Sequence, residues 1–219
     1  MTVALNPKAY AEAIGDASGI DLEARLHEEM PRLMVKSEGI RRRIRLLKPV
    51  TSVGRAESAD VLLPIESVSE HHAELVFDGA TWLVRDLGST NGCLVDGALL
   101  RGDQAPMNRH TLVGFGAARA VFLRNDKQRA AADLREEQRA VKLLVQMGRL
   151  GRSEAQEAIR IVRSDPTQSL AEILLMDTPL QPGEWTTAVA SARRQRGLLD
   201  GLGQFFAGLF RRKPKRLAP

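Results

Sequence analysis

Two β-rich runs lie in the stretch ESVSEHHAELVFDGATWLVRDLGSTNG, residues 66–92. Asp78 and Gly79 separate them, and this dipeptide suits the positive-φ positions of a tight hairpin turn. We therefore expect an antiparallel hairpin here. Polar residues flank the hairpin on both sides, and the closing sequence STNG offers two hydroxyls and a carboxamide, more than a turn alone needs.

Further short strands are expected on either side of this hairpin. Apolar and basic residues alternate in IRRRIRLL from Ile40, and a second Asp-Gly pair, Asp96 and Gly97, divides the sequence CLVDGALL. The run TLVGFGAARAVFL, which begins at Thr111, supplies a closing strand or two. Many short strands with frequent turn signals favour a β-sandwich, which we place at residues 39–125.

The rest of the chain divides into segments of different composition. After Asp126 the sequence is rich in Ala, Arg, Glu, Gln and Leu, and Val141, Leu144 and Met147 share one helical face. The predicted fold class is therefore multidomain β + α, an antiparallel β-sandwich followed by a small α-helical bundle. The other segments are an irregular, partly helical N-terminal extension at 1–38, a linker at 126–136, a helical domain at 137–196, and an amphipathic helix with a basic tail at 197–219.

Three polar clusters lie where predicted strands end or begin. Gly54 and Arg55 form the first, Ser69 and His72 belong to the second, and the sequence STNG forms the third. Loops at one end of a sandwich can converge, so we expect the three clusters at one apex. In this order and at these spacings they resemble the forkhead-associated (FHA) domain, over about residues 40–124.

The resemblance implies a domain that binds phosphothreonine peptides. Guanidinium forks, hydroxyls and backbone amides suit a phosphate dianion, and this sequence supplies that set. By resemblance, Arg55, Ser69 and Thr90 would donate to the phosphate, while Asn91 would hold the peptide backbone. Structural roles at the site are expected for Gly54, His72, Ser89 and Gly92.

Glu70 departs from the family pattern, because this position often carries arginine, lysine or asparagine facing the ligand. A carboxylate near a dianion repels it. Glu70 therefore points away, or selects a basic residue on the peptide, or lowers the affinity for phosphate. We place Glu70 among the peptide-binding residues on the hypothesis that it selects a basic peptide residue.

No enzymatic site is expected, because the sequence offers no nucleophile with a base, no paired carboxylates in a plausible cleft and no metal-ligand spacing. The single cysteine, Cys93, excludes an intrachain disulfide and a zinc site built from cysteine pairs. No cofactor or metal is predicted. Residues 143–177 resemble the N-terminal helical domains of type II secretion and type IV pilus assembly ATPases, but no GxxxxGK[ST] loop follows them.

Basic residues concentrate at the C-terminal end of a chain whose formal net charge is +5. An apolar helical face followed by a basic run occupies residues 198–216, and its apolar part spans about 20 Å, too short to cross a bilayer. An anionic membrane surface, a protein partner and packing on its own bundle are the alternatives for this segment. Nucleic acid is not expected, because the aromatic residues do not alternate with the charges.

These observations predict a bacterial adaptor that binds a phosphothreonine-containing protein, a substrate of a serine/threonine kinase. Its helical module would dock an assembly ATPase or another protein. The alternative is a structural or assembly protein, of secretion or pilus-like machinery, that uses the FHA fold as a phosphate-independent protein contact. No signal peptide or spanning segment is found, so the cytoplasm is expected, with the tail at the inner face of the membrane as one alternative.

Overall fold

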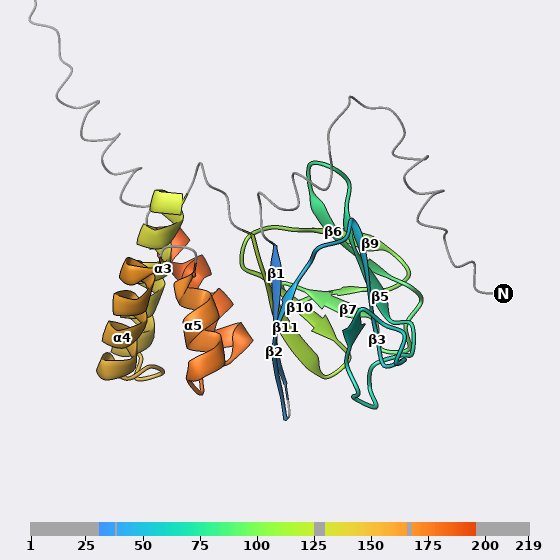
Figure 1. The fold of residues 1–219 in the computed structure, drawn as a ribbon, viewed down its shortest axis with the longest axis horizontal. Coiled ribbons are helices and arrows are strands. Elements are labelled where there is room, and N and C mark those ends of the chain that lie inside the picture. Colours follow the sequence, from blue (N-terminus) through green and yellow to red (C-terminus); the bar gives the residue numbers. More distant parts are fainter. Residues whose placement is uncertain (1–30, 38, 125–129, 166–167, 196–219) are drawn as a thin grey trace, which may run out of the picture.

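Two β-sheets dominate the computed structural model, which describes residues 31–37, 39–124, 130–165 and 168–195 (Figure 1). Within these ranges every strand pair is antiparallel except β3–β4. The first sheet has the order β2-β1-β11-β10-β7-β8 and contains β1 (Arg32–Ser37), β2 (Ile40–Arg45), β7 (Cys93–Val95), β8 (Ala98–Leu100), β10 (Thr111–Phe115) and β11 (Ala118–Leu123). The second has the order β4-β3-β5-β6-β9 and contains β3 (Val50–Gly54), β4 (Val61–Leu62), β5 (Ala73–Phe77), β6 (Trp82–Asp86) and β9 (Gln104–Met107).

Both hairpins expected from Asp-Gly pairs are present. β5 and β6 are joined through Asp78, whose side chain accepts hydrogen bonds from the backbone N–H groups of Ala80 and Thr81. β7 and β8 are joined through Asp96 and Gly97, which both have positive φ, 49° and 91°. That pair of left-handed residues is what a type I′ turn requires. The sandwich predicted for this part of the chain is confirmed.

The first core lies between the two sheets. β6 alternates buried and half-buried residues, as a strand with one core face does. The rings of Phe77 and Trp82 stack with centroids 5.3 Å apart, and Phe122 from the other sheet lies 5.8 Å from Trp82. Aromatic packing of this kind adds to the free energy gained from burial alone.

β1 begins earlier than the sequence indicated. We assigned residues 1–38 to an extension, but Arg32–Ser37 form a strand between β2 and β11. Five of its six residues are buried, so it lacks the alternation that marks a half-exposed strand. Leu33 belongs to the first core, whereas Met34 belongs to a second core on the other face of the sheet. The predicted extension up to residue 30 lies outside the described residues.

Helices cover the outer face of the six-stranded sheet. They are α3 (Ala130–Gln146), α4 (Arg152–Ser164), α5 (Leu170–Asp177) and a further helix at 182–195. The start of α3 falls inside the segment 126–136 that we predicted as a linker. Figure 1 shows α5 beside β1 and β2, with α4 on the far side of the bundle. In the described part of the chain, no helix is long and apolar enough to span a membrane.

The second core joins the helices to the sheet. Met34, Val121 and Leu123 from the strands pack with the side chains of the bundle, among them Leu144 and Trp185. Charged contacts surround this core: Glu172 of α5 is almost fully buried and binds both Arg32 and, over 2.8 Å, Arg43. The sandwich and the bundle are therefore packed against each other rather than held apart by a linker.

Candidate functional site

Three loops meet at one end of the sandwich, as the sequence predicted. The loop after β3 is tied to the loop before β5 by two backbone bonds, from Arg55 N–H to the Ser69 carbonyl (2.9 Å) and from Ala56 N–H to the Glu70 carbonyl (3.2 Å). The loop after β6 joins them, because Thr90 N–H donates to the Ser69 hydroxyl over 3.1 Å. Arg55, Ser69 and Thr90 are thus brought together by bonds among their own loops.

Gly54 makes the first of these approaches possible. A Cβ atom at this position would lie 1.9 Å from the Glu70 carbonyl oxygen and 2.8 Å from its carbon. No side chain fits that gap without moving the loop, so the residue type at position 54 is fixed by the close approach of two backbones.

The Arg55 side chain is anchored at its base and exposed at its tip. Its Nε donates to the Val68 carbonyl over 3.2 Å, which fixes the direction of the guanidinium group. The side chain is 46% exposed, and Nη2 lies 3.9 Å from a carboxylate oxygen of Glu70, itself 69% exposed. An exposed pair at that distance contributes little, so an anionic ligand can replace Glu70 as the partner of Arg55.

The hydroxyls of Ser69 and Thr90 face each other across the apex. Their oxygens are 3.5 Å apart, at the limit of a hydrogen bond, and Thr90 is exposed. Both hydroxyl hydrogens can therefore turn toward a ligand. Asn91 is also exposed, and its side-chain N–H donates to the Ser67 carbonyl over 2.8 Å.

His72 supports the apex from beneath and is fully buried. Its Nδ1 accepts from Ser69 N–H over 3.0 Å, and its Nε2 lies 3.2 Å from the Gly92 carbonyl. These partners require a neutral ring with the proton on Nε2. Burial lowers the pKa of His72, against the opposing effects of the Gly92 carbonyl and the Asp86 charge, which agrees with that neutral form.

Asp86, at the end of β6, organises the loop that carries Thr90. Its carboxylate accepts bonds from the hydroxyl and N–H of Ser89, from Gly88 N–H, and from Gly102 N–H over 2.7 Å. The Ser89 hydroxyl then accepts from Gly92 N–H over 2.9 Å. Burial alone would raise the pKa of Asp86, but these hydrogen bonds outweigh it and the pKa is lowered.

A cluster of potential metal ligands lies behind the apex. Among the described residues, His72, Asp86 and Cys93 hold ligand atoms within 4.8 Å of one another. The histidine nitrogens and the carboxylate already have the partners given above, and the Cys93 thiol lies 3.5 Å from Asp86. Burial, with the charge of Asp86, also raises the pKa of the Cys93 thiol, which disfavours the thiolate that a metal would need. We interpret the cluster as structural support for the loops.

Comparison with known proteins assigns this part of the chain to a domain family. Residues 51–116 match the FHA domain family, and the match contains all three loops. The chain contains an FHA domain. It is similar to the FHA domain-containing protein FhaB of Mycobacterium tuberculosis, with 38% identity over 82 residues that form 36% of this chain and 53% of the relative.

Two further similarities were found. The glycogen accumulation regulator GarA of Mycolicibacterium smegmatis is 36% identical over 85 residues, 39% of this chain and 52% of GarA. A solved structure from a study of phosphothreonine-dependent FHA domain interactions is 26% identical and covers 44% of this chain and 97% of its own, with a TM-score of 0.41. The chain spans about half the length of the curated relatives it matches.

Two residues of the FHA apex were not assigned roles from the sequence. Asp86 is the anchor of its loop. The sequence DLGS carried a signal for it, since an aspartate in a turn often accepts the backbone N–H two residues on, here that of Gly88. Ser67 accepts from Asn91 through its carbonyl and from Ala117 N–H through its hydroxyl. No local pattern marks Ser67, because its partners lie 24 and 50 residues away.

Proposed function

We propose that this chain is an adaptor whose FHA domain binds phosphothreonine in a partner protein. The observation that carries the proposal is the convergence of Arg55, Ser69 and Thr90 at an exposed apex that buried groups hold in shape. The guanidinium supplies positive charge, and the two hydroxyls supply directed donors. Such charge-assisted bonds are short and about twice as strong as neutral ones, which suits a phosphate dianion.

The choice of threonine over serine in this proposal rests on the family resemblance. The resemblance assigns phosphate contacts to Arg55, Ser69 and Thr90, and peptide-backbone contacts to Asn91. In the free protein the Asn91 side chain already bonds the Ser67 carbonyl, so its orientation is set before the peptide arrives. A pre-oriented amide costs less conformational entropy on binding.

The helical unit would serve as a docking module. Its apolar face is used against the sheet, so a partner would meet the outward face of α4, whose residues Arg152, Glu157, Arg160 and Arg163 are exposed. An assembly ATPase or another protein fits a polar face of this kind. The predicted contact of residues 198–216 with an anionic membrane falls outside the described residues.

A phosphate-independent role is the second candidate, and the pairing of Arg55 with Glu70 favours it. In that case the FHA fold would be a protein contact within a larger assembly. The two candidates make opposite predictions for the guanidinium of Arg55, because only a phosphate requires it.

Fluorescence anisotropy with the full chain tests the proposal. Phosphothreonine, phosphoserine and unphosphorylated degenerate peptide libraries are compared for the natural protein and for Arg55→Ala, with Arg139→Ala on α3 as the matched exposed-arginine control. We expect micromolar binding to phosphothreonine alone, lost in Arg55→Ala and retained in the control. Binding to the partner protein that survives Arg55→Ala and phosphatase treatment would establish the second candidate instead. The full chain is needed because β1 and the second core complete the first sheet.

A further inference from the structure

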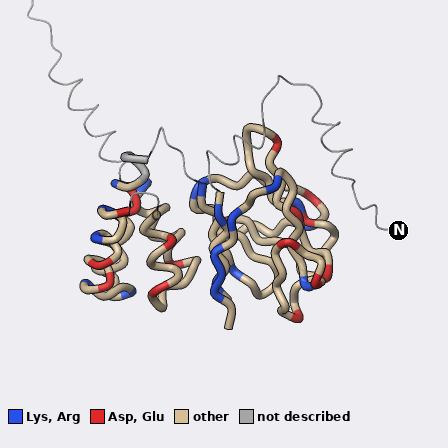
Figure 2. Tube along the Cα trace, viewed as in Figure 1, with Lys and Arg blue, Asp and Glu red and all other residues tan. Residues whose placement is uncertain are grey.

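A row of three cationic side chains crosses the outer face of the first sheet at its end. Lys36 on β1 is the direct cross-strand partner of Arg41 on β2. On the other side, Val35 pairs with Ala120 of β11, so Lys36 and Arg119 occupy the next position of the same register. Figure 2 shows that basic residues are frequent along β1 and β2, the strands that lie next to the helices. Like charges placed opposite each other destabilise a sheet, so other interactions must offset the repulsion within this row.

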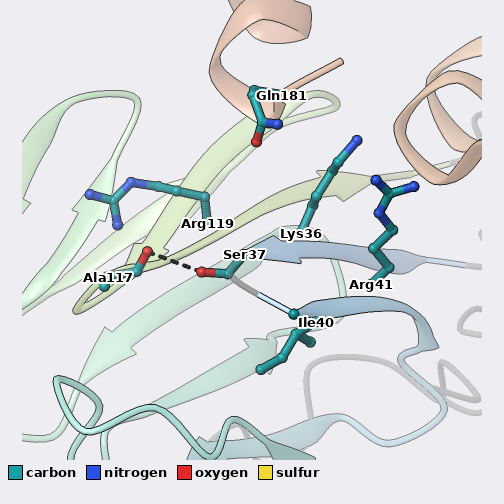
Figure 3. A pocket seen from close by; sticks show the side chains of 8 residues that line it. Lys36, Ser37, Ile40, Arg41, Ala117, Arg119 and Gln181 are labelled. Atoms are coloured by element: carbon teal, nitrogen blue, oxygen red, sulfur yellow. Dashed lines mark hydrogen bonds between the residues drawn. The ribbon is translucent and has the colours of Figure 1, made fainter. Parts of the chain in front are cut away.

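The same face shows how such charge is neutralised where the helices cover it. There Glu172 of α5 binds both Arg32 and Arg43. At the end of the sheet the row lines a pocket of about 720 Å³, shown in Figure 3, although Lys36 itself is only 4% exposed. The described part of its lining includes three cations, Lys36, Arg41 and Arg119, and no acid, while Glu38, which follows Ser37 in the sequence, lies outside the described residues.

Backbone carbonyls hold the three cationic side chains in place. Lys36 Nζ donates to the carbonyls of Thr178 and Leu180, each over 2.6 Å, and Arg41 donates to Met176 over 3.1 Å. Arg119 donates through Nη1 to the carbonyls of Gly116 and Ala118. These acceptors are neutral, so they orient the side chains without cancelling their charge.

Burial and the charge of Arg41 lower the pKa of Lys36 against the opposing charge of Glu184, an acid that lies outside the pocket lining. Its carboxylate accepts from Gln181 N–H and lies 3.6 Å from Arg149. The positive charge of the pocket therefore remains in excess over its described surroundings.

The pocket is connected to the phosphopeptide apex through the turn between β10 and β11. Ala117, at the turn between β10 and β11, lines the pocket, and its N–H donates to the Ser67 hydroxyl over 2.8 Å. Ser67 in turn accepts the side-chain N–H of Asn91 through its carbonyl. The turn is seated closely, because a Cβ at Gly116 would lie 2.2 Å from that same Ser67 carbonyl oxygen. The turn that lines the pocket therefore also contacts the residue that holds Asn91.

We propose that this pocket binds a second anionic group, a carboxylate or a phosphate, on the segment whose phosphothreonine occupies the apex. The inference rests on the proposed function and adds to it the class of partner, an acidic or doubly phosphorylated segment. The helical unit takes part in this recognition, because its carbonyls position Lys36 and Arg41 and because Gln181 lies on the pocket wall.

Peptide scanning with the full chain tests the inference. One series fixes a single phosphothreonine in a neutral background and moves one glutamate through the flanking positions; a second series moves a second phosphothreonine instead. We expect one side of the peptide to show a maximum, with affinity raised about two- to fivefold by the carboxylate and further by the phosphate, as for a partly exposed ion pair.

Two variants connect that gain to the pocket. Arg41→Gln removes one charge from an exposed side chain. Gln181→Glu adds a negative charge on a side chain of nearly the same shape and leaves the three cationic residues unchanged. Both should abolish the gain and leave the affinity for the neutral-background phosphopeptide unchanged, whereas Arg139→Gln, at an exposed position of α3 outside the pocket, should retain the gain.

The outcomes separate this inference from the proposed function. If the phosphothreonine peptide binds and no acidic position strengthens it, or if the gain survives both pocket variants, the second site is refuted while the adaptor function stands. If no phosphopeptide binds at all, both are refuted. A gain in the second series alone would assign the pocket to phosphate rather than to carboxylate.

Discussion

The backbone N–H of Ser69 donates to Nδ1 of His72 over 3.0 Å, so a buried neutral imidazole fixes the residue that offers its hydroxyl to the ligand. The opposite ring nitrogen reaches the Gly92 carbonyl, next to Asn91. One side chain therefore connects two of the three loops of the apex. The histidine acts on binding through loop geometry, since both ring nitrogens are occupied by the protein itself.

The free energy of unfolding should fall as the pH is lowered from 7 to 5. Burial is the first cause that lowers the pKa of His72, and burial with the charges of Arg109 and Arg193 lowers that of His110 well below its usual value. Below about pH 6.5 the unfolded chain binds protons at these histidines that the folded chain does not. Their contribution to the free energy of unfolding is therefore fully present above this pH and decreases as the pH falls below it. The slope for each histidine approaches about 1.4 kcal/mol per pH unit.

Urea unfolding at several pH values measures this effect. The interval from pH 7 to 5 contains the ordinary pKa of histidine and lies above the ordinary pKa values of Asp and Glu, so it suits a test of the two buried histidines. His72→Gln and His110→Gln should each reduce the slope, and the double variant should flatten it. A slope that is unchanged in the double variant would contradict the assignment.

Gly54→Ala should disrupt the apex while leaving the sandwich folded. The added Cβ would meet the Glu70 carbonyl oxygen at 1.9 Å, so the two loops must separate. We expect a loss of about 1–3 kcal/mol in the free energy of unfolding, as for other overpacked sites, and a loss of phosphopeptide binding. Gly183→Ala is the matched control, because its new Cβ would have its nearest neighbour at 4.0 Å. Circular dichroism and peptide anisotropy measure the two effects.

Local sequence signals predicted most of the sandwich and the convergence at its apex. Asp-Gly pairs mark both hairpins because few other residues adopt positive φ at low cost. The three polar clusters predicted at strand ends do meet at one end of the sandwich. The supporting contacts were harder to predict. Ser67 and Gly116 meet across some fifty residues, and only the folded backbone brings them together.

The junction between sheet and bundle was missed for a different reason. β1 is buried on both faces, so its sequence RLMVKS has neither the alternation of an edge strand nor the length of a helix. Its two basic residues look like surface residues until Glu172 and the carbonyls at the end of α5 are placed opposite them. Tertiary partners decide the burial of such residues, and no local window contains them.

Glu70→Gln should strengthen phosphopeptide binding. The carboxylate lies 3.9 Å from Nη2 of Arg55 and competes with the phosphate for it, and it also repels the dianion. Because both groups are exposed and screened by salt, we expect a gain of about two- to fivefold in affinity, largest at low ionic strength.

A peptide array separates repulsion from selection at this position. If Glu70 selects a basic residue, the natural protein should prefer Arg or Lys near the phosphothreonine and Glu70→Gln should lose that preference. Glu157→Gln on α4 is the control, since its carboxylate is also exposed and also lies beside an arginine, Arg160. An array without any basic preference in the natural protein would rule out selection and leave repulsion as the role of Glu70.

Glu172→Ala should destabilise the junction by about 3–5 kcal/mol, because it leaves Arg32 buried without its carboxylate.

The two tryptophans report each half separately: Trp82 lies in the sandwich core and Trp185 in the helical core. With Trp82→Phe or Trp185→Phe as background, urea unfolding should give coincident transitions for the natural junction, and Glu172→Ala should move the Trp185 transition to lower urea than that of Trp82. Glu157→Ala, which breaks an exposed pair on α4, should move neither. Transitions that stay coincident and unshifted in Glu172→Ala would show that the apolar contacts of the second core hold the two halves together without this buried charge network.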